Sequence, residues 1–99
     1  MPGKTLEFHP AALEELKSAL SWYRERSVIA ANRLAAEIDR CIALVSASPQ
    51  RWPLRADGTR RFILSHFPFA VVYRETETTI QILAFAHRYR RPGYWRNRV

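Results

Sequence analysis

The chain has 99 residues, 47% of them hydrophobic and 25% charged, with a net charge of +7. This length allows one domain, expected over residues 1–99, and the near-average composition argues against a disordered or fibrous chain. Residues 1–50 carry six basic and six acidic residues, whereas residues 51–99 carry ten arginines and three acids. The second half is therefore expected to meet an anionic partner, whether nucleic acid, an acidic protein segment or a membrane surface.

The first half of the chain predicts a short strand followed by two helices. Leu6–Phe8 has strand character, and Pro10 suits the first position of a helix because its missing N–H would have no partner there. Apolar residues then recur at helical spacing, which predicts a helix from about Pro10 to Glu25. Ser27 is the expected N-cap of a second helix, which Ser48-Pro49 ends. The short joint predicts an antiparallel helix hairpin.

The second half predicts a loop and then three strands. Prolines and an Asp57-Gly58 turn indicate a loop over residues 49–59, and a polar turn over residues 75–78 separates the last two strands. The expected strands are Arg60–Leu64, Phe69–Arg74 and Thr79–His87. The predicted fold is α+β: a strand, a two-helix hairpin and a three-stranded antiparallel meander, with the helices covering one face of a small sheet. The other face is expected to be open to solvent or a partner, because the chain supplies only one layer of helices. The tail from Arg88 is expected to lie outside the core because it is too charged.

The end of the chain carries the most distinctive motif. It reads His-Arg-Tyr-Arg-Arg-Pro-Gly-Tyr-Trp-Arg over residues 87–96 and resembles the C-terminal strand and tail of ParE-type toxins. Two further stretches are similar to that family: residues 6–12, an opening strand and helix start, and residues 60–74, the middle strands. The resemblance covers nearly the whole chain and places it in the ParE/RelE superfamily of toxin-antitoxin toxins, on the ParE-like branch.

The resemblance implies a toxin that a cognate antitoxin neutralises by wrapping a flexible segment across its surface. ParE-like members are associated with poisoning DNA gyrase, and RelE-like members cut messenger RNA on the ribosome. The expected function is a non-enzymatic toxin of the first kind; a ribosome-dependent endoribonuclease is the alternative. The fold alone does not choose between them. RelE-like sites commonly contain lysines on the middle strands, whereas this chain has no lysine after Lys17.

The candidate site lies in the basic second half. In a strand Arg61 points away from the core residues Phe62 and Leu64, so Arg61, not Arg60, is expected on the functional face. The residues expected to bind target or antitoxin are Arg61, Arg74, His87, Arg88, Arg90, Arg91, Tyr94 and Trp95. A nuclease would use Arg61, Arg74, His87 and Tyr94. Internal ion pairs between the tail arginines and acids of the helices would remove the basic surface that both hypotheses, target binding and RNA cleavage, require.

Membrane insertion, export and metal binding are not expected. The longest apolar stretch, residues 67–73, is far shorter than the roughly 20 residues that span a bilayer, and the N-terminus lacks the apolar core of a signal peptide. The lone Cys41 suits a buried position in a cytoplasmic protein. The three histidines are scattered, so neither a metal nor another cofactor is expected. The aromatic residues Trp22, Tyr23 and Trp52 are expected to pack in the core or the helix hairpin.

Overall fold

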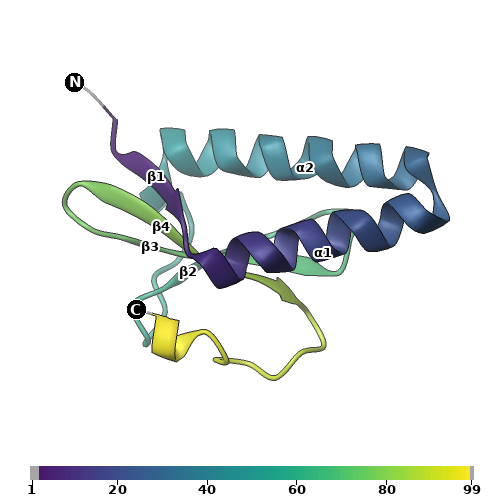
Figure 1. Cartoon of the computed structure of the whole chain (residues 1–99). Helices are drawn as coiled ribbons and strands as arrows, with labels where there is room; N and C mark the ends of the chain where they lie inside the picture. The colour runs from purple at the N-terminus through teal and green to yellow at the C-terminus, as the bar shows by residue number, and fades with distance from the viewer. Residues whose placement is uncertain (1–2, 99) are drawn as a thin grey trace.

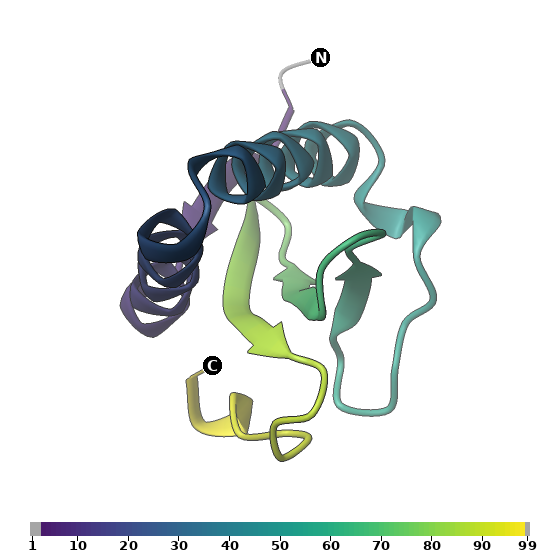
Figure 2. The same cartoon turned by 90° about the vertical axis from the view of Figure 1, so that its right-hand side faces the viewer.

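The computed structural model describes residues 3–98 and confirms the predicted α+β fold (Figure 1). Two helices cover one face of a four-stranded sheet, and the C-terminal segment lies beneath the other face (Figures 1 and 2). In chain order the elements are β1 (Thr5–Phe8), α1 (Pro10–Arg26), α2 (Val28–Ala47), the 3-10 helix η1 (Pro49–Arg51), β2 (Arg60–Ile63), β3 (Phe69–Glu75), β4 (Thr79–His87) and the 3-10 helix η2 (Arg96–Arg98). No helix in this part of the chain is long and apolar enough to cross a membrane.

One residue joins the two helices. The Ser27 N–H donates to the Tyr23 carbonyl at 2.7 Å and so ends α1, while the Ser27 hydroxyl accepts from the Ala30 N–H at 3.1 Å and so begins α2. The predicted Ser27 cap is therefore confirmed, and the antiparallel hairpin follows from this tight joint. At the other end of α1, Pro10 occupies the first turn as predicted, and the His9 ring accepts from the Ala11 N–H at 3.1 Å.

The strand order is β1-β4-β3-β2. Strands β2, β3 and β4 form the predicted antiparallel meander, and β1 joins the free edge of β4 in parallel, with Leu6 opposite Ile80. A β-bulge lies between β3 and β4, because Val72 pairs with Ala84 whereas Tyr73 pairs with Ile82. The unpaired Leu83 and its neighbour Ala84 consequently both belong to the cluster on the face away from the helices.

The main core lies between the helices and the sheet. Its largest fully buried side chain is Tyr73, whose hydroxyl donates to the Pro49 carbonyl at 2.7 Å and so ties β3 to the end of the helix hairpin. Cys41 is buried in α2 as predicted, and burial raises the pKa of its thiol to about 12. The predicted turn after the hairpin is also present: the Asp57 carboxylate accepts from the Thr59 N–H and hydroxyl, and Gly58 has a φ of 81°.

Candidate functional site

The C-terminal tail, here residues 88–98, folds back onto the face of the sheet opposite to the helices, called here the tail face. Trp95 is only 3% exposed and packs in a second small core with Val72, Leu83, Ala84 and Ala86. The expectation that this face is open and that the tail contributes nothing to a core was therefore wrong for Trp95. Burial of the indole removes a large apolar area from water, and the free energy gained outweighs the cost of bringing the charged neighbours of Trp95 close to the sheet.

Glu15 of α1 anchors the tail. Its carboxylate accepts from the Arg98 guanidinium at 2.9 and 3.1 Å and from Arg90 at 3.2 Å. These hydrogen bonds are the main reason that the pKa of Arg98 is raised. Burial raises the pKa of Tyr94, which lies under both guanidiniums, to about 12.

The same contacts satisfy an unpaired stretch of strand edge. Strand β1 stops opposite Ile82, so β4 continues without a neighbour on that side. There the Phe85 N–H donates to Glu15 at 3.1 Å, and the Leu83 carbonyl accepts from Arg98 at 2.9 Å. Since a buried backbone group without a partner is costly, Glu15 and Arg98 take the place of the missing strand.

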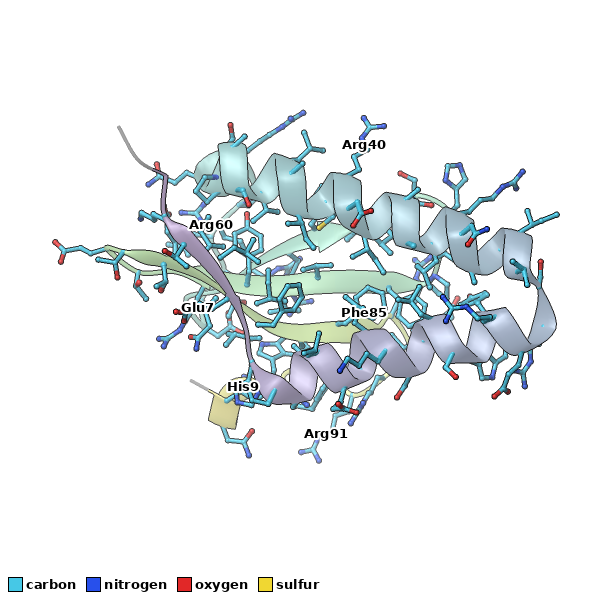
Figure 3. All side chains as sticks on the ribbon, turned by 45° about the horizontal axis from the view of Figure 1, so that its top comes forward. Glu7, His9, Arg40, Arg60, Phe85 and Arg91 are labelled. Carbon is cyan, nitrogen blue, oxygen red and sulfur yellow. The ribbon has the colours of Figure 1, made fainter. Side chains whose placement is uncertain are left out.

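Two of the five tail arginines are thus paired internally, and three are not. Among residues 3–98, Arg88, Arg91 and Arg96 make no ion pair, and all three are exposed. Figure 3 shows Arg91 projecting away from the molecule on the side opposite to Arg40 of α2. The tail therefore offers a basic surface, smaller than the sequence suggested.

Arg61 lies on the tail face, as the strand alternation predicted. Its guanidinium carbon stands 4.9 Å from the centre of the Trp95 ring. Its Nε is buried and has no hydrogen-bond partner among the described residues. Burial, and then the nearby positive charge of Arg55, lower the pKa of Arg61, which nevertheless stays cationic because an arginine starts so high.

Only two of the four candidate nuclease residues come together: Arg61 and His87 line one cleft of about 240 Å³. Arg74 sits at one end of the sheet and donates to Gln81 at 2.8 Å, whereas His87 pairs with Phe69 at the other end. Arg74 lies five residue steps along β3 from Phe69, the partner of His87, which is about 17 Å at the usual rise of a strand. His87 accepts from the Tyr89 N–H at 3.2 Å and so helps to form the first turn of the tail. The Tyr94 hydroxyl is buried.

The structure also contains features that the sequence did not reveal. A cleft of about 590 Å³ lies between α1 and the ends of β3 and β4, lined by Trp22, Tyr23, Phe69, Phe85 and others. In Figure 3 the labelled Phe85 lies between the sheet and the helices. Trp22 is 51% exposed, so the prediction that it packs in the core or hairpin was wrong, whereas Tyr23 and Trp52 do pack against the core. The role of Glu15 was also missed, because it depends on which arginines lie beside Glu15 in the folded chain, and the spacing of residues in the sequence does not show this.

Metal binding finds no support in this part of the chain. No group of three or more histidine, cysteine, aspartate or glutamate residues between residues 3 and 98 is placed to hold an ion. The chemistry that the described surface offers is that of guanidinium groups, which bind carboxylates and phosphates through paired hydrogen bonds.

Comparisons with known proteins agree with this geometry. Residues 6–92 match the family model described as "ParE toxin of type II toxin-antitoxin system, parDE". A solved structure titled "Chromosomal ParDE TA system from P. aeruginosa" contains a similar fold, with a TM-score of 0.61 and 20% sequence identity over 85% of this chain and 95% of that chain. No curated protein sequence gives a match. The family match spans most of the chain, both cores and the start of the tail, and the chain therefore belongs to the ParE toxin family of type II toxin-antitoxin systems.

Proposed function

We propose that the protein arrests growth in the cytoplasm by binding a macromolecular target, DNA gyrase, through the arginines of its tail, and that a cognate antitoxin neutralises it by covering that surface. The observation that carries this proposal is the way the tail is held. Trp95 is buried against the sheet and Glu15 binds Arg90 and Arg98, while Arg88 and Arg91 are exposed and make no ion pair among residues 3–98.

A fixed array of cations is suited to recognition for two reasons. Little conformational entropy is lost on binding, because the backbone is already ordered by its contacts with the sheet. Uncompensated guanidiniums also attract an anionic surface over several ångströms and form forked hydrogen bonds once in contact. Of the candidate nuclease residues, Arg74 lies at the end of the sheet away from His87 and the Tyr94 hydroxyl is buried, so the arrangement favours binding over cleavage of RNA.

The test compares purified wild-type protein with two double variants in a gyrase supercoiling assay. Arg88→Ala with Arg91→Ala is expected to weaken inhibition at least about ten-fold, because two of the free tail cations are lost. Arg24→Ala with Arg40→Ala, which removes two exposed arginines of the helices, is the matched control and is expected to inhibit like the wild type.

Three results would contradict the proposal. Supercoiling by gyrase that is unaffected by the wild-type protein would exclude gyrase as the target. Primer extension after induction that finds codon-linked cuts in messenger RNA would instead establish the ribonuclease alternative. Retained inhibition by the Arg88 and Arg91 double variant would remove the tail from the binding surface.

A further inference from the structure

The larger cleft of the molecule, called here the aromatic cleft, lies between α1 and the ends of β3 and β4. Its volume of about 590 Å³ falls within the range of about 300–1,000 Å³ that is usual for clefts that hold small molecules. The exposed arginines of the tail that make no ion pair, Arg88, Arg91 and Arg96, do not line it. The aromatic cleft is therefore separate from the surface proposed above to bind gyrase.

The rings that line this cleft contact one another in a row. Trp22 meets Tyr23 edge to face with ring centres 4.9 Å apart, and Tyr23 meets Phe69 at 6.5 Å. Phe69 in turn stacks on Phe85 at 4.5 Å and meets the His87 ring edge to face at 5.4 Å. Aromatic rings favour such contacts at about 4.5–7 Å, so a flat ring placed in the cleft would find several partners of the right kind.

Trp22 is the open end of this row. Its side chain is 51% exposed, whereas Phe85 is buried, so the cleft leads from an exposed ring to a buried one. The Trp22 ring already holds one cation, because the guanidinium carbon of Arg26 lies 3.8 Å from its centre. A ligand that covered the rest of the indole would remove a large apolar area from water.

The acidic side chains of the cleft determine which charge it accepts. Glu15 pairs with Arg90 at 3.2 Å and with Arg98 at 2.9 Å, and the Arg90 guanidinium lies over the Tyr94 ring of the tail. Glu14, which also lines the cleft, is exposed and makes no ion pair and no side-chain hydrogen bond among residues 3–98. The carboxylate that is left without a counter-ion therefore favours a cation and disfavours a phosphate or a carboxylate.

We infer that the aromatic cleft binds a small, flat aromatic compound that carries a positive charge, with its ring against Trp22 and Phe69 and its cationic group facing Glu14. The inference goes beyond the proposed function, because the ligand is a small molecule and Arg88 and Arg91 take no part in holding it. An aliphatic amine lacks the ring and an aromatic acid carries the wrong charge, so both compounds test the assignment.

The experiment titrates the full chain with tryptamine, indole-3-acetate and propylamine and follows nuclear magnetic resonance signals. Tryptamine is expected to bind with a Kd on the order of 1 mM or tighter, as is usual for a ligand of this size. Indole-3-acetate and propylamine should each bind at least about five-fold more weakly. The signals expected to shift are the indole N–H of Trp22 and the backbone amides of Glu14 and Ser18, while the indole signals of Trp52 and Trp95 serve as references outside the cleft.

Two pairs of variants assign the contacts, with the amides of residues 14 and 18 as the signals in each. Trp22→Ala is expected to weaken tryptamine binding about ten-fold, whereas Tyr89→Ala removes an exposed ring outside the cleft and should leave binding unchanged. Glu14→Gln should reduce the preference for tryptamine over indole-3-acetate about three-fold, because the charge of the site is lost. Glu7→Gln is its control, since Glu7 is exposed on β1 and does not line the cleft.

Several results would overturn the inference. Tryptamine that shifts none of these signals at millimolar concentration would show that the cleft is not a site for such compounds. Indole-3-acetate or propylamine that binds as tightly as tryptamine would remove the cation or the ring from the recognition, and so would an unchanged Kd in Trp22→Ala or an unchanged preference in Glu14→Gln. Shifts of the same signals when the protein is concentrated without a ligand would show that a second copy of the chain fills the cleft instead. Thermal unfolding of each variant shows whether a loss of binding reflects a loss of fold.

Discussion

The Glu15 carboxylate and the Arg98 guanidinium form a two-point ion pair, with nitrogen–oxygen distances of 2.9 and 3.1 Å, across 83 positions of sequence. Both side chains are only 14% exposed. The pair joins the first helix to the end of the tail, and through Leu83 and Phe85 it also completes the edge of β4. Together with the buried Trp95, this one carboxylate holds the basic tail against the fold.

Glu15→Gln is expected to lower the free energy of unfolding by about 2 kcal/mol, since Arg90 and Arg98 lose their counter-ion while the shape of the side chain is kept. Urea denaturation measures the change. Glu14→Gln is the matched control, because Glu14 is exposed and makes no ion pair among the described residues. A control that loses as much stability as Glu15→Gln would show that general helix charge, and not the tail anchor, is responsible.

The two tryptophans Trp95 and Trp22 are expected to differ sharply when replaced by alanine. Trp95→Ala should cost about 3–5 kcal/mol, because it empties the small core on the tail face. Trp22→Ala should cost less than about 1 kcal/mol, because that ring is half exposed and its partner Arg26 lies at the surface. Equal losses in chemical denaturation would mean that the tail does not pack on the sheet as described.

The helices and strands were predictable because each follows from local rules. Proline at the start of α1, Ser27 at the joint and the Asp57-Gly58 turn act through neighbouring backbone groups, and all three are found as expected. The strand alternation likewise placed Arg61 on the correct face. The ends of the elements differ by a residue at most: α1 reaches Arg26, β2 stops at Ile63 and β3 extends to Glu75.

The tail was misjudged because its packing depends on contacts that sequence spacing does not reveal. The charges of the tail argued against burial, but the apolar contacts of Trp95 with the side chains of the tail face stabilise the packed arrangement by more than the charges cost. Which arginines stay free depends on Glu15, and Glu15 meets them only because β1 ends early and leaves an edge of β4 to be filled. The separation of Arg74 from His87 likewise required the register of β3 with β4.

Stability is expected to fall as the pH rises above about 9. Folded Cys41 has its pKa raised to about 12 by burial, whereas the thiol in the unfolded chain keeps its ordinary pKa of 9.0. A raised folded pKa gives stability that is complete below the unfolded pKa and is lost as the pH rises toward the folded pKa, at about 1.4 kcal/mol per pH unit. Burial raises the pKa values of Tyr73 and Tyr94 from 10.0 to about 12, so both tyrosines add to the loss of stability above pH 10.

The variant Cys41→Ala separates these contributions. Urea denaturation under reducing conditions at several pH values should show no loss between pH 9 and 10 in this variant, while the loss above pH 10 remains. The comparison uses the change with pH and not the absolute stability, because the smaller side chain also leaves a small cavity. An unchanged slope from pH 9 would show that another group titrates there.

Gly93 reverses the tail so that Tyr94 and Trp95 can reach the sheet, and its φ of 80° is one that other residues adopt only at a cost. Gly93→Ala is expected to lose about 1 kcal/mol or more, and the added Cβ would stand 2.9 Å from the Arg96 Nε, which must move. Gly93→Asn should lose less, since asparagine tolerates positive φ better than alanine does.

Gly58→Ala, with a φ of 81° and open space around the added Cβ, measures the backbone cost alone. If Gly93→Asn is as unstable as Gly93→Ala, crowding against Arg96 and not backbone strain holds the glycine in place, because both side chains carry the same Cβ.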